Sequence, residues 1–441
     1  MNILFISLGC DKNLVDSEVM LGLLDAKGYR IVDEESQADI IVINTCCFIH
    51  DAKEESIQTI LEMAEYKKEG RLKVLAVTGC LAQRYQQEIL DEIPEVDVVL
   101  GTATYDKIVD AVEEALAGNG GVRMSPLCVL PDVSAKRLVT TGGHYAYLKI
   151  AEGCDKHCTY CIIPKLRGSY RSVPMERLVS EAEELASQGV KELILVAQET
   201  TVYGKDLYGE KALYRLLREL CRIDGIRWIR LLYCYPEEID DSLIRVMKEE
   251  TKICHYLDLP IQHANDDILR RMGRRTSQSQ LVEMIGRLRR EIPDIALRTT
   301  LITGFPGETD EQHGELLAFV DEMEFDRLGV FTYSREEDTP AAAMPGQIPE
   351  EVKEDRQAEL MELQQEIAFA QAEEMVGREV LAMIEGKVAD ENAYVGRTYK
   401  DAPGVDGLIF IHTDEELMSG DFARVKVTGA SEYDLIGELM R

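Results

Sequence analysis

The sequence predicts an α/β protein of three parts: an N-terminal domain on a parallel sheet, a central partial (β/α)6 barrel of the TIM type, and a small C-terminal all-β barrel. Two series of short apolar runs that alternate with amphipathic segments predict the two parallel-sheet parts. Short apolar runs separated by Gly, Asp and Pro predict the small barrel. A chain of 441 residues also exceeds the usual size of one hydrophobic core, so several domains are expected.

We place the N-terminal domain at residues 1–118, a linker at 119–140, the central domain at 141–375 and the C-terminal domain at 376–441. The linker is predicted from turn-forming residues that begin just before it, at Gly118, and continue with Gly120, Gly121, Pro126 and Pro131.

Each domain shows its own periodicity. The N-terminal domain is expected to form strands at 2–8, 40–43, 74–78 and 96–100, and helices at 13–27, 51–68 and 105–117. The central domain is expected to form strands at 145–150, 192–197, 226–232, 255–259, 295–301 and 327–332, with helices between them that include 175–187 and 310–323. A long charged helix is expected at 349–375, followed by short strands at 380–384, 393–395, 407–411, 422–427 and 435–439.

One motif stands at the end of the first central strand. Cys154, Cys158 and Cys161 have the spacing C-x3-C-x2-C, with Tyr160 just before the third cysteine. Three thiolates on one short loop can hold three irons of a [4Fe–4S] cluster, which normally takes four cysteines. The iron that is left open can bind S-adenosylmethionine, whose cleavage to a 5′-deoxyadenosyl radical is the cofactor's own chemistry. The alternative is a structural zinc site that uses His157, but no second ligand pair of the usual kind follows.

A second set of cysteines follows successive strands of the N-terminal domain. Cys10, Cys46 and Cys80 stand at the carboxyl ends of three predicted strands, the edge where parallel sheets bind ligands. They could hold a second cluster, again with one open iron; the alternative is that they are ordinary buried cysteines. Cys47 competes with Cys46, and we prefer Cys46 because it falls in Asn44-Thr45-Cys46. The cysteines without ligand spacing are expected to pack in the core: Cys128, Cys221, Cys234 and Cys254.

Polar side chains stand at the carboxyl ends of the central strands, where barrels of this type carry their active sites. They are Gln198, Glu199, Gln262, His263 and Glu308. Arg298, within the fifth strand, can pair with a carboxylate such as that of a bound methionine moiety, or it can form an ordinary ion pair. We interpret His263 as a hydrogen-bonded polar residue and not as a ligand.

The chain is strongly acidic. It has 81 Asp and Glu against 49 Lys and Arg, a formal net charge of −32, which opposes nucleic acid and attracts a basic partner. Residues 376–441 contain 7 Lys and Arg against 13 Asp and Glu, whereas a small barrel that binds RNA is normally basic. An odd count of 11 cysteines in a large chain indicates cluster ligation in a reducing cytosol and not a disulfide framework. We expect neither a targeting segment nor a membrane span.

The whole chain resembles the methylthiotransferases, a branch of the radical S-adenosylmethionine enzymes, and is most similar to their ribosomal-protein branch. The resemblance is carried by Leu8-Gly9-Cys10-Asp11-Lys12-Asn13-Leu14-Val15-Asp16-Ser17-Glu18 and by Cys154 to Gly168, which ends Ile162-Ile163-Pro164-Lys165-Leu166-Arg167-Gly168. The transfer-RNA branch typically has a Gln-Met-Asn-like opening and Pro-Tyr-Thr-Arg-Gly after the cysteines. This chain departs from its own branch at Asp11, where proline is usual, and at Glu199, where aspartate is usual.

The resemblance implies an N-terminal cluster domain, a radical S-adenosylmethionine barrel and a terminal barrel of the TRAM type. It implies two [4Fe–4S] clusters and S-adenosylmethionine, which serves both as radical source and as methyl donor. Residues expected near the cofactor are Tyr160, Gln198, Glu199, Gln262, Arg298 and Glu308.

The implied reaction is methylthiolation of the β-carbon of an aspartate in the small-subunit ribosomal protein near the decoding centre, which gives 3-methylthioaspartate. The implied partners are that basic protein, free or in the ribosome, a reductant such as flavodoxin or ferredoxin, and a sulfur donor, all in the cytoplasm. Three alternatives stay open: a transfer-RNA methylthiotransferase, a radical enzyme whose second cluster only relays electrons, and a non-catalytic iron–sulfur or zinc-binding protein.

Overall fold

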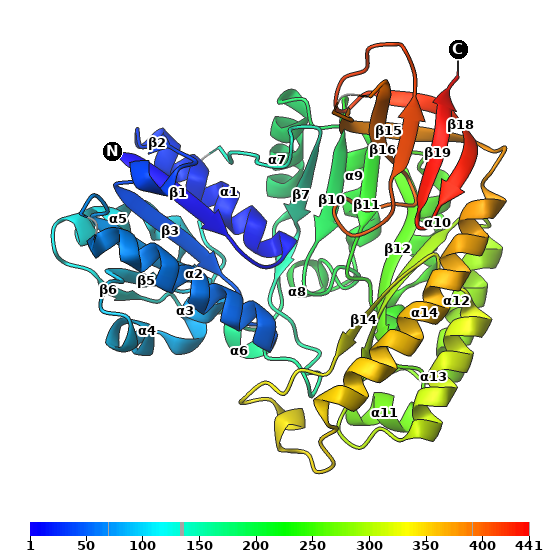
Figure 1. Ribbon diagram of the computed structural model, residues 1–441, viewed down its shortest axis with the longest axis horizontal. Coiled ribbons are helices and arrows are strands. Elements are labelled where there is room, and N and C mark those ends of the chain that lie inside the picture. Colours follow the sequence, from blue (N-terminus) through cyan, green and yellow to red (C-terminus); the bar gives the residue numbers. More distant parts are fainter. Residues whose placement is uncertain (69, 133–135, 390, 441) are drawn as a thin grey trace. The chain divides into compact units, whose positions relative to one another are not determined.

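The computed structural model describes residues 1–68, 70–132, 136–389 and 391–440 (Figure 1). The chain divides into two compact units. The first unit contains residues 1–140, 151–173 and 334–342, and the second contains 141–150, 174–333 and 343–441. Because residues 151–173 belong to the first unit, both sets of three cysteines lie in that unit.

The first unit is built on a parallel sheet of six strands in the order β2-β1-β3-β4-β5-β6. The strands are β1 (Asn2–Ser7), β2 (Arg30–Ile31), β3 (Ile40–Thr45), β4 (Val74–Gly79), β5 (Val98–Leu100) and β6 (Gly121–Arg123). Strands β1, β3, β4 and β5 confirm the predicted series. The short β2 and β6 were not predicted, and β6 lies in residues expected to be a linker, where it pairs with β5. Residues 133–135 of that expected linker lie outside the described residues.

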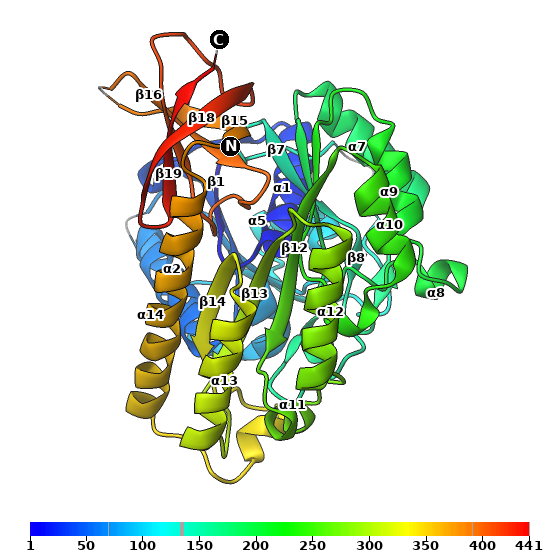
Figure 2. The same ribbon diagram turned by 90° about the vertical axis from the view of Figure 1, so that its right-hand side faces the viewer.

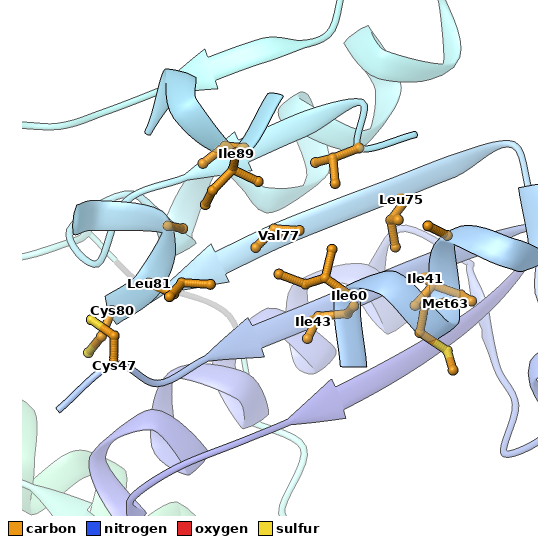
Figure 3. Close-up of a cluster of buried hydrophobic side chains, with 14 of the residues drawn as sticks. Ile41, Ile43, Cys47, Ile60, Met63, Leu75, Val77, Cys80, Leu81 and Ile89 are labelled. Atoms are coloured by element: carbon orange, nitrogen blue, oxygen red, sulfur yellow. The ribbon is translucent and has the colours of Figure 1, made fainter. Parts of the chain in front are cut away.

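Helices cover both faces of this sheet because the strand residues alternate between two cores. On one face Ile40 and Val42 pack with α1 (Asp11–Ala26) and α5 (Ile108–Leu116). On the other face, Ile41 and Ile43 pack against a second set of helices (Figure 3). That set is α2 (His50–Lys68), α3 (Cys80–Tyr85), α4 (Gln87–Glu92) and α6 (Ile163–Arg167). The short helices α3, α4 and α6 were not predicted, because five or six residues carry too little periodicity.

The second unit contains an open, parallel sheet in the order β14-β13-β12-β11-β10-β7. The strands are β7 (Tyr145–Lys149), β10 (Glu192–Val196), β11 (Trp228–Leu231), β12 (Ile253–Gln262), β13 (Ala296–Thr303) and β14 (Arg327–Thr332). The helices between them are α7 (Met175–Ser187), α8 (Lys205–Tyr208), α9 (Leu213–Cys221), α10 (Asp241–Glu249), α11 (Asp266–Arg271), α12 (Gln278–Glu291) and α13 (Asp310–Met323). The long α14 (Glu350–Glu374) packs beside α13 and β14 (Figure 2). This sheet confirms the predicted partial (β/α)6 barrel.

The C-terminal strands of the second unit form a closed barrel in the order β15-β16-β17-β19-β18. They are β15 (Glu379–Lys387), β16 (Ala393–Thr398), β17 (Ile409–His412), β18 (Phe422–Ser431) and β19 (Asp434–Leu439). Alternate residues such as Ile384, Ile411 and Val425 fill the interior. The predicted small all-β barrel is confirmed, and with it the fold class.

A buried ionic cluster joins the small barrel to the amino-terminal ends of the central strands. Glu192, the first residue of β10, is fully buried and accepts hydrogen bonds from Arg230 (2.8 Å) and Arg397 (2.7 Å). Arg397 lies on β16 of the small barrel, and Arg230 also donates to the Tyr399 carbonyl. The active-site end of such a sheet is the carboxyl end. The small barrel is therefore anchored at the opposite end.

Within the described residues, no helix has both the length and the apolar character needed to cross a membrane.

Candidate cluster-binding site

The structure brings Cys10, Cys46 and Cys80 to one edge of the first sheet. Cys10 lies between β1 and α1, Cys46 directly follows β3, and Cys80 begins α3 at the end of β4. Strands β1, β3 and β4 are neighbours and parallel, so their carboxyl ends meet. Cys46 and Cys80 are buried, at 7% and 4% exposed, and Cys10 is half-buried. The predicted convergence of three thiols is thus present in the fold.

A glycine makes the close approach of two of these residues possible. Gly9 has a φ of +88°, which favours glycine, and it precedes Cys10. A Cβ placed on Gly9 would lie 2.7 Å from the Cβ of Cys46 and 3.0 Å from its sulfur. Any other residue at position 9 would therefore push Cys46 away from Cys10.

The three thiols act on one another electrostatically. Burial, followed by the neighbouring Cys80, raises the pKa of the Cys46 thiol to about 12, and Cys10 contributes in the same direction. Burial also raises the pKa of the Cys80 thiol, with Arg167 opposing it and Cys10 adding to it. Cysteine binds metal as the thiolate, so a bound iron would displace these protons. Three soft sulfur donors at one edge of the sheet fit a [4Fe–4S] cluster.

Cys47 has different surroundings from Cys46. Its side chain is fully buried in the hydrophobic cluster on the α2 and α3 side of the sheet, where Cys80 also lies (Figure 3). Cys46 instead lies against Gly9 beside Cys10. A ligand to a shared cluster must face the other two ligands. Cys80 acts electrostatically on both thiols, and Cys10 also acts on Cys46, so these contacts favour Cys46. The choice between the two stays a prediction.

The second set of cysteines lies in a loop framed by a two-stranded hairpin. The strands β8 (Ala151–Glu152) and β9 (Arg171–Ser172) pair antiparallel around the loop. The Cys154 amide donates to the Gly168 carbonyl (3.1 Å), and the Cys161 amide donates to the Cys158 carbonyl (3.0 Å). Cys154 and Cys158 are 6% and 5% exposed. The loop thus holds three cysteines in a compact turn, as the spacing predicted.

The alternative of a structural zinc site requires His157 to act as a ligand together with the three cysteines of this loop. His157 is exposed and has a φ of +53°, and Tyr160 is half-buried. Across residues 1–68, 70–132, 136–389 and 391–440, no three His, Cys, Asp or Glu side chains are spaced to hold a single metal ion. A four-iron cube is larger than one ion and separates its ligand sulfurs more widely.

One buried arginine contacts residues that flank both cysteine sets. Arg167, the last residue of α6, is 1% exposed. Its Nη1 donates to Glu152 (3.0 Å) and to Asp16 (3.1 Å), and its Nη2 donates to Asn13. Asn13 in turn donates to the Thr45 carbonyl (3.0 Å), next to Cys46. Arg167, Asn13 and Asp16 stand in the two segments that carry the family resemblance, but nothing in their spacing indicates that they meet.

The polar residues predicted near the cofactor lie in the second unit, apart from Tyr160. Most of them form hydrogen bonds or ion pairs with other residues of that unit. Glu199 accepts from the Thr201 amide (3.0 Å). Glu308 accepts from the Gly304 amide (2.8 Å), and Gln262 ends β12 with a φ of +73°. Gln198 is half-buried.

Arg298 forms ion pairs inside the second unit. It donates to Asp258 (3.0 Å) on β12 and lies 3.4 Å from Asp406 of the C-terminal region. Both carboxylates are buried, and the Arg298 side chain is 19% exposed. Of the two interpretations that the sequence left open, the ordinary ion pair is the one that the structure contains.

His263 is fully buried. Its Nδ1 accepts from the Asn265 amide (2.9 Å), and its Nε2 lies 3.8 Å from the Glu308 carboxylate. Burial lowers its pKa to about 3, so the ring is neutral. It is a buried polar residue, as the sequence indicated, although only Nδ1 has a hydrogen-bond partner within the described residues.

The comparisons with known proteins agree with this geometry. Residues 2–101 match the uncharacterized protein family UPF0004, residues 148–320 match the Radical SAM superfamily, and residues 376–440 match the TRAM domain. Among solved structures, the radical S-adenosylmethionine methyltransferase TsrM from Kitasatospora setae has a TM-score of 0.57 at 15% identity. That likeness covers 77% of this chain and 76% of TsrM, and it shows the fold. The fold and the two cysteine sets define a protein of the radical SAM class.

Curated relatives match the chain along nearly its whole length. The ribosomal protein uS12 methylthiotransferase RimO of Lachnoclostridium phytofermentans is 67% identical over 437 residues, covering 99% of both chains. The RimO proteins of Desulfitobacterium hafniense and Clostridioides difficile are 50% and 48% identical, and each match covers at least 98% of both chains. The chain belongs to the RimO family of methylthiotransferases, which confirms the resemblance seen in its motifs.

Proposed function

We propose that this chain is a radical S-adenosylmethionine methylthiotransferase that modifies the β-carbon of an aspartate in ribosomal protein uS12. The observation that carries the proposal is the presence of two sets of three cysteines in one unit of the fold. The relatives named for uS12 methylthiolation, one of them 67% identical over the whole chain, support the substrate.

Each cysteine set holds one [4Fe–4S] cluster in this proposal. Cys154, Cys158 and Cys161 hold the cluster that binds S-adenosylmethionine, and Cys10, Cys46 and Cys80 hold the other. When bound, the clusters and S-adenosylmethionine supply an adenosyl radical and a methylthio group. The chain's own part is to bind and orient: it fixes two sets of thiolates on one compact unit, and positioning of reactants is a large contribution to such reactions.

The polar residues have supporting roles. Tyr160 adjoins the third cysteine of its loop, and Gln198, Glu199 and Gln262 stand at the carboxyl ends of their strands. Glu308 fixes the turn after β13 through the Gly304 and Phe305 amides. In this proposal each of these residues is a candidate for binding S-adenosylmethionine.

Arg298 would bind a carboxylate of the cofactor only by exchanging its partners. It is already paired with Asp258 and Asp406, so the ordinary structural role is the simpler one. The domain boundaries 1–118, 119–140, 141–375 and 376–441 remain part of the proposal.

The partners follow from charge and chemistry. A formal charge of −32 favours a basic protein such as a ribosomal protein over a polyanionic transfer RNA. A reductant such as flavodoxin or ferredoxin and a sulfur donor complete the reaction, and we place it in the cytoplasm, where thiols stay reduced.

The test is anaerobic incubation of the reconstituted protein with S-adenosylmethionine, a reductant and sulfide, with uS12 and transfer RNA as parallel substrates. Mass spectrometry should find a methylthio group on one aspartate of uS12 and none on transfer RNA. The variant with Cys154, Cys158 and Cys161 changed to Ala should lose 5′-deoxyadenosine and still form S-adenosylhomocysteine. A methylthiolated adenosine in transfer RNA, with uS12 unchanged, would replace the proposal by the transfer-RNA alternative.

A further inference from the structure

Arg167 is a buried cation that two carboxylates, those of Asp16 and Glu152, hold in place. It follows the Cys154–Cys161 loop in sequence and is 1% exposed. Its Nη1 lies 3.0 Å from both Glu152 oxygens and 3.1 Å from Asp16, which itself is 3% exposed. Removing a guanidinium from water carries a large free-energy cost even when it is paired, so such a group needs a specific reason to be there.

The surroundings of Arg167 give that reason. Its Nη2 donates to Asn13, whose Oδ1 is 3.9 Å from the Cys80 sulfur. Asn13 also donates to the carbonyls of Leu8 (3.1 Å) and Thr45 (3.0 Å), two residues from Cys10 and next to Cys46 respectively. Arg167 and Asn13 thus reach the backbone or side chain around all three N-terminal cysteines.

The guanidinium of Arg167 is the positive charge that these contacts place beside the N-terminal cysteine set. It favours negative charge on that set, and the carboxylates of Asp16 and Glu152, which hold it, partly oppose this effect.

We propose that Arg167 is a positioning residue of the N-terminal cysteine site, where its guanidinium, held by Asp16 and Glu152, offsets the negative charge of a cluster on Cys10, Cys46 and Cys80. The inference rests on the part of the proposed function that places a cluster there. A cluster with three thiolates becomes more negative when it gains an electron, and a fixed cation stabilises that reduced form more than the oxidised form. Arg167 thereby raises the reduction potential of this cluster.

Arg167 lies in a short segment that also contacts the other cysteine set. The residue belongs to the segment between Cys161 and Gly168, and Gly168 accepts the hydrogen bond of the Cys154 amide. One short segment thus shapes the loop of one cysteine set and supplies the cation of the other. Both cysteine sets therefore make contacts with this one segment.

The test compares Arg167→Gln and Arg167→Lys in the full-length, reconstituted protein. The readouts are iron per chain and the reduction potential of each cluster, followed by electron paramagnetic resonance. The two triple Cys→Ala variants assign each signal to its cysteine set. Arg137→Gln is the matched control, because Arg137 is also buried in the first unit (4% exposed) and pairs with Glu18 at 3.2 Å.

Arg167→Gln should make reduction of the N-terminal cluster about tenfold less favourable, a fall of about 59 mV for one electron. Arg167→Lys should restore most of the potential, because it keeps the charge. The control should leave both potentials unchanged. A purely structural role would lower the unfolding temperature in Arg167→Gln without moving the potential, and that result would overturn the inference.

The outcomes separate this inference from the proposed function. If the Cys10, Cys46 and Cys80 set binds no iron in the unaltered protein, the proposed function and the inference both fail. If two clusters are present and uS12 is modified, but the Arg167→Gln potential equals that of the control, only the inference fails. An equal shift of both clusters would also overturn it, because the assignment to one site would be lost.

Discussion

Arg84 and Glu336 form a buried ion pair at 2.9 Å, with side chains only 6% and 2% exposed. Arg84 lies on α3, the helix that begins at Cys80, whereas Glu336 belongs to the segment 334–342 of the same compact unit. In that segment the Ala341 amide donates to the carbonyl of Thr159, between Cys158 and Cys161 (2.9 Å). A stretch of chain far along the sequence therefore ties the two cysteine regions together.

The first prediction concerns this ion pair. Arg84→Met leaves Glu336 buried without its charged partner, and we expect the free energy of unfolding to fall by about 3–5 kcal/mol. Arg123→Met is the control, because the Arg123–Glu114 pair is exposed at 37% and 51% and should contribute about 0–1 kcal/mol. Urea unfolding followed by circular dichroism measures both. Equal losses in the two variants would contradict the prediction.

The second prediction concerns iron content. Two independent sets of three cysteines should give about eight irons per chain after anaerobic reconstitution. Changing Cys154, Cys158 and Cys161 together to Ala should leave about half of them. A colorimetric iron assay on the folded protein makes the measurement. Retention of all the iron, or loss of all of it, would show that the two sets are not separate sites.

The third prediction concerns pH. Burial lowers the pKa of His263 to about 3, well below the usual value near 6.5, so the unfolded chain takes up a proton before the folded chain does. Stability associated with the neutral ring is therefore complete above about pH 6.5 and is lost as the pH falls toward 3, by on the order of a few kcal/mol. Charged and titratable neighbours of the ring are Glu308, His313 and Arg356.

The check is the pH dependence of urea unfolding between pH 7 and pH 5. His263→Gln should flatten the slope, while His412→Gln, at an exposed position, should keep the slope of the unaltered protein. If His263→Gln loses stability with acid as steeply as the unaltered protein, the neutral state of His263 is not the source of the slope.

The fourth prediction concerns partner choice. Asp414, Glu415 and Glu416 are exposed on the small barrel, and they add to the acidic field of the chain. Attraction to a basic protein is screened by salt, so binding of uS12 should weaken as the salt concentration rises. Changing all three residues to Lys should weaken it further, measured as a slower association rate. Tighter binding of uS12 by the Lys variant, or activity gained on transfer RNA, would contradict the assignment of the partner.

Local patterns were enough to predict most regular elements. Helices α7 and α13 and strand β14 have the predicted bounds, because each carries a periodicity long enough to recognise. Strands β2 and β6 were not predicted, because they are short and lack the apolar run that marks the equally short β5, so only pairing in the sheet defines them. The role of Arg298 stayed open for a similar reason: one of its partners, Asp406, comes from the C-terminal region.

By itself, the sequence determined the three-part α/β architecture, the family and the two sets of three cysteines. Periodicity and short spacings depend only on residues that are close together in the sequence. The tertiary structure decided which distant groups meet. Arg167 reaches Asn13 across 154 positions, and Arg84 reaches Glu336 across 252 positions. Such contacts depend on how the chain folds back on itself, and the favourable pairing of buried charges exists only after that folding has excluded water.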